Sequence, residues 1–219
     1  MFPILIIVAM FWFMVSIYFT YARYQLPPRG GNVQEKIWEL VLSNLEWNGQ
    51  GQPLDIGCGN ASLTIKLAHK YLKAQIIGID YLGKKWEYSE GICEKNAEIE
   101  GVRKRVSFLK ASASKLPFED ESFDAAVSNL TFHEVKDTED KREIIREALR
   151  VVKKGGHFAF QDLFLLKRLY GETDELIATI RGWGITKVEF VETSGAPFIP
   201  TALKLSFMVG TIGMISGEK

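Results

Sequence analysis

The sequence predicts a doubly wound α/β fold: a mostly parallel seven-stranded sheet covered by helices on both faces, preceded by one N-terminal transmembrane helix. Short apolar runs alternate with longer amphipathic stretches along most of the 219 residues, which is typical of parallel strands joined by helices. A glycine-rich turn follows the first of these runs, where such folds bind ligands. The third observation is an uncharged apolar segment at the N-terminus, which sets this part apart from the rest.

The N-terminal segment is long enough to cross a bilayer. Residues 2–22 carry no charge and, as a helix, would measure about 31 Å. Tyr18 and Tyr21 lie near the first basic residue, Arg23, as aromatic residues do at a membrane surface. We therefore expect a single-pass membrane anchor over residues 1–24, with the catalytic domain in the cytoplasm. A cleaved signal peptide is the alternative, although no basic region precedes the apolar run, and a buried core helix is a third.

A short stretch rich in proline and glycine separates this anchor from the soluble domain. Residues 25–31 read Gln-Leu-Pro-Pro-Arg-Gly-Gly and predict a linker. The domain is expected to cover residues 32–219. It begins with a helix whose apolar residues recur between Val33 and Leu45, and for which Asn32 and Glu35 form a capping box.

The rest of the domain alternates predicted strands and helices. The last segment, residues 204–217, is expected to be a final strand, antiparallel at the far end of the sheet. The strands are expected near residues 53–57, 75–80, 105–109, 123–128, 157–162 and 186–191, and the helices near 61–72, 84–100, 138–153 and 172–182.

Composition and charge exclude several classes of function. The chain has 27 basic and 27 acidic residues, so it lacks the basic surplus of a nucleic-acid binder. Its two cysteines, Cys58 and Cys93, are far apart, which speaks against a disulfide framework or a zinc site. We expect a small-molecule substrate, no nucleic acid and no metal, while the oligomeric state stays open.

A cofactor site is predicted where the first strand ends. The sequence there reads Leu-Asp55-Ile-Gly57-Cys58-Gly59-Asn, and its glycines allow a tight turn and close approach of a ligand. Asp55 would repel a pyrophosphate but attract an ammonium group. Asp80 ends the second strand, 23 residues after Gly57, the spacing at which an acid binds ribose hydroxyls. These residues predict a cofactor that contains a nucleoside and a positive charge.

The fourth strand adds polar groups at the same edge of the sheet. Residues 116–129 read as a turn that feeds a strand, and Asn129, Phe132 and His133 follow at its carboxyl end. In parallel strands these ends lie on one rim, close to the glycine-rich turn.

Together these motifs resemble the class I S-adenosylmethionine-dependent methyltransferases, in particular the small methyltransferase-domain group that includes quinone, sterol and lipid methyltransferases. The resemblance covers about residues 32–217 and implies a Rossmann-like fold with S-adenosylmethionine as cofactor. It implies that the glycine turn holds the methionine part, that Asp80 binds the ribose hydroxyls and that Tyr81 flanks the adenine. The cofactor-binding residues expected on this basis are Asp55, Gly57, Cys58, Gly59, Asp80, Tyr81, Ser112, Ala113 and Asn129.

The chain departs from the family's pattern at two places. In the third-strand motif, Lys110–Phe118, Ser112 stands where the family commonly has an acid that accepts from the adenine amino group. A hydroxyl accepts this bond more weakly. The segment Val152–Gly156 resembles the family's L-x-P-G-G turn, with Val152 for Leu and Lys154 for Pro.

His133 is the candidate catalytic base, because the motif places it toward the transferred methyl group. A part in the pocket wall is the alternative, since a sulfonium already activates its methyl group and a strong base is not required. His69 and His157 are interpreted as a surface and a strand-start residue. The charge run of residues 136–150 is interpreted as the solvated face of a helix, without a role in binding.

The predicted function is methyl transfer from S-adenosylmethionine to a small-molecule acceptor. Tethering to the membrane favours a hydrophobic or lipid-like acceptor, for which Leu163–Leu166, Phe198 and Ile199 are candidate access residues, with plain core contacts as the alternative reading. A nicotinamide-dependent oxidoreductase is the first alternative function, although residues 57–62 read G-x-G-x-x-S and not G-x-G-x-x-G. A catalytically inactive, membrane-anchored interaction module is the second.

Overall fold

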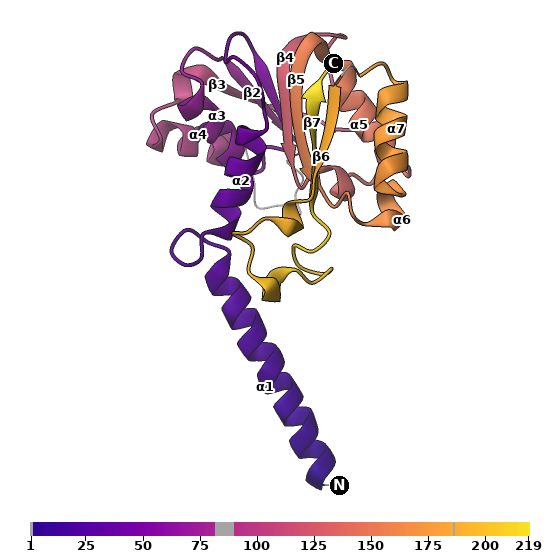
Figure 1. The fold of residues 1–219 in the computed structure, drawn as a ribbon. Helices are drawn as coiled ribbons and strands as arrows, with labels where there is room; N and C mark the ends of the chain where they lie inside the picture. Colours follow the sequence, from indigo (N-terminus) through magenta and orange to yellow (C-terminus); the bar gives the residue numbers. More distant parts are fainter. Residues whose placement is uncertain (1, 82–89, 186) are drawn as a thin grey trace.

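One mixed sheet forms the centre of the protein. The computed structural model describes residues 2–81, 90–185 and 187–219, and among these the strands pair in the order β3-β2-β1-β4-β5-β7-β6 (Figure 1). The first five strands run parallel to one another, whereas β7 is antiparallel to both of its neighbours. The predicted fold class is thus confirmed. The strands are β1 (Pro53–Ile56), β2 (Ile76–Asp80), β3 (Val106–Lys110), β4 (Phe123–Asn129), β5 (Val152–Asp162), β6 (Lys187–Val191) and β7 (Gly213–Glu218).

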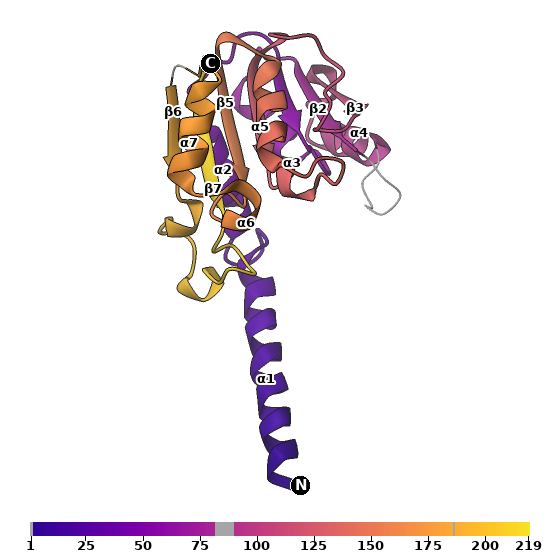
Figure 2. The same ribbon diagram turned by 90° about the vertical axis from the view of Figure 1, so that its right-hand side faces the viewer.

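Helices cover both faces of the sheet, as Figures 1 and 2 show. One face carries α2 (Val33–Ser43), α3 (Ser62–Lys70) and α4 (Glu90–Ile99). The other carries α5 (Lys141–Arg150), the short α6 (Lys167–Tyr170) and α7 (Thr173–Gly182). Single 3₁₀ turns lie in the connecting loops. They are η1 (Arg103–Arg105) before β3, η2 (Phe132–Glu134) after β4, and η3 (Thr193–Gly195) and η4 (Thr201–Leu203) between β6 and β7.

The central strands are buried on both faces, which fixes the position of their carboxyl ends. Leu54 and Ile56 of β1 pack into one apolar cluster together with α5 and α7, while Ala125 and Val127 of β4 pack into another with α2 and α3. Near-continuous apolar runs of this kind are expected in parallel strands covered on both sides. The loops at the carboxyl ends therefore stand on a rigid base.

Helix α1 (Phe2–Gln25) projects from the domain (Figure 1). It is long and apolar enough to cross a membrane, with a mean hydropathy of 2.2, and its apolar stretch is not buried by the rest of the described chain. It is therefore not a core helix of this chain. Its C-terminal part joins the domain: Ala22 is buried against Val33, Leu203 and Val209, and Tyr18 contacts the segment that follows β6.

The position of the last strand was predicted wrongly. β7 is antiparallel as expected, but it begins at Gly213 and lies between β5 and β6 instead of at the far end of the sheet. The first four residues of β7 are all buried, whereas Lys187 and Glu189 of β6 are exposed. A strand with charged side chains suits an edge, so the more apolar strand takes the inner place.

The fifth strand starts earlier than predicted, at the expense of the helix before it. The predicted helix over residues 138–153 is confined to α5, because Asp140 caps it by accepting a hydrogen bond from the backbone N–H of Arg142 (3.0 Å). Residues 152–156, interpreted as a turn, belong to β5, where Val152 pairs with Phe123 before a register shift.

Of the helix predicted over residues 84–100, residues 84–89 lie outside the described part of the chain.

The predicted capping box at the start of α2 is absent. Asn32 has φ 57° and ψ 30°, in the left-handed region, and its side chain makes no capping hydrogen bond. Asn can adopt this conformation at little cost, and here it turns the chain sharply between the linker and α2. Glu35 forms an ion pair with Lys66 of α3 instead.

Candidate active site

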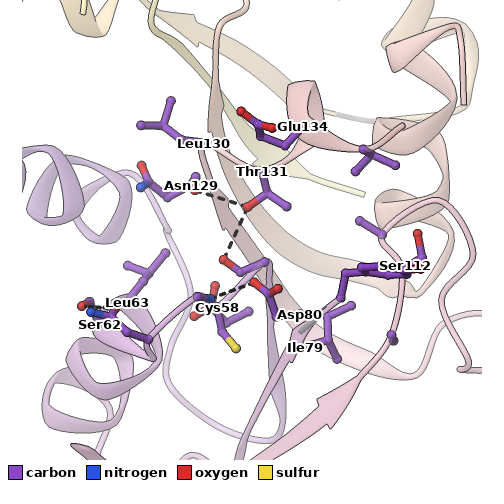
Figure 3. A pocket seen from close by; sticks show the side chains of 18 of the residues that line it. Cys58, Ser62, Leu63, Ile79, Asp80, Ser112, Asn129, Leu130, Thr131 and Glu134 are labelled. Carbon is purple, nitrogen blue, oxygen red and sulfur yellow. Dashed lines mark hydrogen bonds between the residues drawn. The ribbon is translucent and has the colours of Figure 1, made fainter. Parts of the chain in front are cut away.

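A cavity of about 660 Å³ opens at the carboxyl ends of β1, β2 and β4 (Figure 3). Each of these strands contributes side chains to it, and α2 covers one side with Gln34 and Trp38. The structure brings together nine of the ten residues singled out from the sequence as site residues. Those that line the cavity are Asp55, Gly57, Cys58, Gly59, Asp80, Tyr81, Ser112, Ala113 and Asn129.

The glycine turn after β1 is attached to the end of β2 by hydrogen bonds. The backbone N–H groups of Gly57 and Cys58 both donate to the carbonyl of Ile79 (2.8 and 2.9 Å), and that of Gly59 donates to Asp80 Oδ2 (2.9 Å). Gly57 has φ 79°, and a Cβ atom there would overlap the side chain of Thr131. The turn therefore requires glycine at position 57.

Gly59 has a different surrounding from Gly57. Its φ is 55°, and a Cβ atom at this position would meet no atom within 4 Å. The backbone is thus bare toward the cavity, which leaves room for a ligand to approach the turn closely.

Asp55 lines the cavity and has one carboxylate oxygen without a hydrogen-bond partner. The residue is 1% exposed, and its Oδ2 accepts a hydrogen bond from the Thr64 hydroxyl (2.6 Å). Its Oδ1 is buried and has no hydrogen-bond partner. Burial raises the pKa of this carboxyl to about 7; the Thr64 hydroxyl lowers the pKa, and the charge of Asp80 raises it. A cationic donor placed against Oδ1 would restore the ionised form and satisfy the orphaned oxygen.

A carboxylate that the sequence interpretation overlooked lies beside Ser112. Asp137 Oδ2 accepts hydrogen bonds from Ser114 (2.7 Å) and Ser112 (3.1 Å), and Asp137 lines the cavity. These bonds, that from Ser114 first, lower the pKa of Asp137. The residue precedes α5 and is not on the solvated helix face to which the charge run was assigned. It lies in the loop between β4 and α5, and the local sequence pattern there does not mark it as a site residue.

Asn129 is held in place by a chain of polar side chains. Its Oδ1 accepts a hydrogen bond from Gln161 Nε2 (2.8 Å), and Gln161 Oε1 accepts one from the Thr193 hydroxyl (2.7 Å). Gln161 and Thr193 are both buried, so this network is rigid. With its oxygen engaged in this way, the Asn129 amide offers its NH₂ group as a donor at the cavity wall.

His133 lies beside the cavity and does not line it. Its Nδ1 is 2.8 Å from Oδ1 of Asp162, a fully buried carboxylate at the end of β5. The Tyr170 hydroxyl also donates to this oxygen (3.1 Å), and the backbone N–H of Phe132 donates to Oδ2 (2.8 Å). This network fixes the ring and the tautomer in which Nδ1 carries the proton.

The electrostatic surroundings of His133 favour its charged form. Burial lowers the pKa of the imidazole, but the hydrogen bond and charge of Asp162, with the charge of Glu134, outweigh it and raise the pKa above its ordinary value. Glu134 Oε1 is 3.4 Å from Nε2. The second nitrogen is therefore the one through which His133 can exchange a proton.

The other side of the cavity is apolar. Leu130 lines the cavity and also packs against a cluster, hereafter the apolar cluster, in which α1, α2 and the segment before β7 meet. Leu130 has φ 55°, a strained conformation for a branched residue. Of the predicted access residues, Leu163, Phe198 and Ile199 belong to this region, whereas Phe164 is buried in the main core. The buried members of the apolar cluster are Ala22, Val33, Ile37, Ile199, Leu203, Val209 and Ile212.

The family model of the methyltransferase domain matches residues 54–160. A relative from Amycolatopsis mediterranei, 27-O-demethylrifamycin SV methyltransferase, is 34% identical over 113 residues, which cover 52% of this chain and 39% of that protein. The sterol 4-C-methyltransferase strm-1 of Caenorhabditis elegans is 29% identical over 143 residues, 63% of this chain and 40% of its own. The matches thus span about two fifths of these relatives' length.

A solved structure shows the same fold at low sequence identity. Geranyl diphosphate C-methyltransferase from Streptomyces coelicolor A3(2), solved with Mg²⁺, geranyl diphosphate and S-adenosyl-L-homocysteine, superposes with a TM-score of 0.64 at 13% identity, covering 84% of this chain and 79% of that one. The glycine turn, the mixed seven-stranded sheet and these matches agree with one another. The chain carries a methyltransferase domain on the fold of the class I methyltransferases.

Proposed function

We propose that this methyltransferase uses S-adenosylmethionine to methylate a hydrophobic or lipid-like small molecule at a membrane surface. The observation that carries the cofactor assignment is the pair of carboxylates at the cavity. Asp55 offers an orphaned oxygen suited to an ammonium group, while Asp80 lies at the end of β2, suited to ribose hydroxyls. A nicotinamide dinucleotide would bring a pyrophosphate toward Asp55, which repels it.

The residues around the cavity fit the parts of S-adenosylmethionine. Asp55 would hold its ammonium group, Asp80 its ribose, and Tyr81 would flank its adenine. The bare backbone at Gly59 makes room for the methionine part, which a side chain would block. Asp137, presented by Ser112 and Ser114, would accept from the adenine amino group where the family commonly uses an acid of the third-strand motif.

Bound in this site, the cofactor supplies a methyl group already activated by the sulfonium. The protein's task is then to place the acceptor in line with that group and to exclude water, which is worth up to about 7–11 kcal/mol in well-oriented systems. Trp38 and Leu130 close the cavity on the side of α2 and the apolar cluster. His133 would accept a proton from the acceptor at Nε2, with Nδ1 held by Asp162.

The membrane location of the acceptor is inferred from α1. Its last turn is part of the domain's packing, with Ala22 buried in the apolar cluster, which supports retention of the helix over cleavage as a signal. A retained helix keeps the cavity near the membrane, because residues 26–32, which join α1 to α2, reach only about 25 Å when extended. One relative is named a sterol 4-C-methyltransferase, and a sterol is likewise a hydrophobic acceptor.

The cofactor assignment is tested by calorimetric titration of the full chain in detergent with S-adenosylmethionine and, separately, with NAD. We expect binding of the first and not of the second. Asp80→Ala should weaken binding of S-adenosylmethionine by about 1.5–3 kcal/mol, because a charged acceptor of hydrogen bonds is lost. Asp174→Ala removes an exposed acid on α7 and serves as control. Equal affinity of the Asp80 variant and the unmutated chain would refute the role of Asp80.

The acceptor class is tested with S-adenosylmethionine labelled in its methyl group. Membranes that contain the full chain are incubated with the label and then extracted into a lipid and an aqueous fraction. We expect the label in the lipid extract. Label confined to polar metabolites or protein would refute the lipid-like acceptor and leave the methyltransferase assignment intact.

A further inference from the structure

Two large apolar side chains are exposed in the segment between η4 and β7. Phe207 is 65% exposed and Leu205 is 43% exposed, and Lys204 beside them is exposed as well. We call residues 201–208 the platform. In Figures 1 and 2, two views at right angles, this part of the chain lies beside the end of α1 that joins the domain, on the side from which α1 projects.

The platform is attached to α1 at a defined position along the axis of this helix. The Tyr18 hydroxyl donates a hydrogen bond to the carbonyl of Ala202 (3.0 Å), and the ring of Tyr18 meets that of Phe207 edge-on, with centroids 6.1 Å apart. Tyr18 precedes Arg23 by five residues, which is about 7.5 Å along a helix axis. Phe207 therefore lies closer to the free end of α1 than Arg23 does.

This position along α1 decides whether the platform faces water or the membrane interface. Where α1 crosses a bilayer, residues before Arg23 lie progressively deeper, and tyrosine side chains at this level occupy the boundary between headgroups and acyl chains. The platform shares the level of Tyr18. It also combines bulky apolar side chains with an exposed lysine, the combination by which proteins bind the surface of anionic membranes.

We propose that the platform is a second membrane contact, in which Leu205 and Phe207 enter the bilayer interface and Lys204 meets lipid phosphates. This proposal rests on the proposed anchoring by α1. Two contacts fix the tilt of the domain, which one helix and a linker alone would leave free. The platform's buried Leu203 belongs to the apolar cluster against which Leu130 of the cavity packs. The platform and the cavity wall at Leu130 therefore pack against the same apolar cluster, so a bilayer contact at the platform also brings the cavity close to the membrane.

The proposal is tested with a fluorophore on single introduced cysteines in the full chain. Phe207→Cys carries an environment-sensitive nitrobenzoxadiazole label, and the protein is reconstituted into vesicles of phosphatidylcholine and phosphatidylglycerol. The two native cysteines are buried, and the unmutated chain treated in the same way gives their background. Leu205→Cys provides a second platform position should Phe207→Cys not fold.

Matched positions make the result specific. Leu72 and Ile99 are exposed apolar residues before β2 and β3, 73% and 70% exposed, at the opposite edge of the sheet. Their cysteine variants report on a water-facing apolar position. Met10→Cys, in the middle of α1, reports on the anchor itself. Each variant is compared only after it binds S-adenosylmethionine as the unmutated chain does.

Quenching by nitroxide lipids and by iodide then separates the outcomes. We expect the label at 207, like that at 10, to be quenched several-fold more by nitroxide lipids than the labels at 72 and 99, and to be protected from iodide. A label at 207 open to iodide, with that at 10 protected, overturns the platform and leaves the anchor standing. A label at 10 open to iodide refutes both. A label at 207 shielded from both quenchers means that protein covers the platform, and it overturns the lipid contact.

Discussion

The carboxyl edge of the sheet has two halves that are held together by different forces. The cofactor half, at the ends of β1 and β2, consists of short turns joined by hydrogen bonds, such as those from Gly59 to Asp80 and from Cys58 to Ile79. The acceptor half, beyond Leu130, is formed by apolar side chains of α1, α2 and the segment before β7. Hydrogen bonds are directional, whereas apolar packing is not.

This difference separates what the two halves can specify. Polar groups at fixed positions select one charged ligand and reject others, because a mismatch leaves a buried polar atom unpaired. An apolar surface accepts molecules of many shapes and discriminates weakly among them. We therefore expect substitutions in the cofactor half to change affinity for S-adenosylmethionine, and those in the acceptor half to change turnover.

Gly57→Ala should have the largest effect. Its left-handed φ of 79° disfavours any side chain, and the new methyl group would overlap Thr131. We expect binding of S-adenosylmethionine to fall more than about 100-fold, a loss of roughly 3 kcal/mol, measured by calorimetry. Gly155→Ala shares a positive φ of 72° but meets no neighbouring atom and does not line the cavity, so it should retain full affinity. Full affinity in the Gly57 variant would show that the turn can rearrange.

His133→Ala tests the candidate base beside the cavity, which belongs to neither half. Turnover into the lipid extract should fall by about 100-fold if the imidazole removes a proton, with little change in cofactor affinity. Because Asp162 raises the pKa of His133, the basic form appears as pH rises through that raised value, and turnover of the unmutated chain should rise with it. The variant should lack this rise. His69→Ala, which removes an exposed histidine of α3, is the control.

If the ratio of turnover between the unmutated chain and His133→Ala does not change with pH, His133 only shapes the wall of the cavity and is not a base. A large drop in cofactor affinity with normal turnover would move this residue into the cofactor half.

Asp55→Asn should affect stability and binding in opposite directions. The native pKa of about 7 lies above the ordinary 3.8, so the folded protein holds a proton that the unfolded chain releases. Without ligand, Asp55 therefore costs stability as pH rises from about 4 through 7. At pH 8 the Asn variant should unfold with a free energy roughly 1–3 kcal/mol higher, yet bind S-adenosylmethionine more weakly. Denaturant titrations at pH 5 and pH 8 measure this, and a variant less stable at pH 8 would contradict the burial argument.

Asp137→Asn should have the smallest effect, at the outer rim of the cofactor half. We expect affinity to fall about 3- to 10-fold, because a charge-assisted bond to the adenine amino group becomes a neutral one. An S-adenosylmethionine analogue without that amino group should bind both proteins equally. Glu139→Gln changes an acid that does not line the cavity and should leave affinity as it was. If the analogue binds the unmutated chain and Asp137→Asn with different affinities, Asp137 does not act through the adenine amino group.

The sheet could be predicted from the sequence because local patterns determine most of it. Each strand is an apolar run bounded by turns, and parallel pairing follows from the helices between them. The order of β6 and β7 depends on which of two sequence-distant strands fits beside β5. Lys187 and Glu189 of β6 carried the relevant signal, because alternating charges mark an edge strand. Asn32 was misread because the same residue type both caps helices and adopts left-handed turns.

The site was predictable only where its residues are close in sequence or fall at fixed spacings. Asp55, Gly57, Gly59 and Asp80 follow directly from such spacings. Ser112 indicated that a carboxylate was missing near the adenine position, but no local pattern names Asp137, which comes from a different loop. Gln34 and Trp38 reach the cavity through the packing of α2, a contact between segments that sequence periodicity does not specify.

The inner position of β7 has a consequence for how the chain is made. Among the described strands, β6 pairs with β7 alone, so it cannot join the sheet until residues 213–218 have been synthesised. During translation, β1 to β5 can assemble while the free edge of β5 stays open, and such an edge invites pairing with another nascent chain. A chain cut short before Gly213 would lose two strands at once. The domain should therefore show its strongest dependence on chaperones late in synthesis, in the interval between β5 and β7.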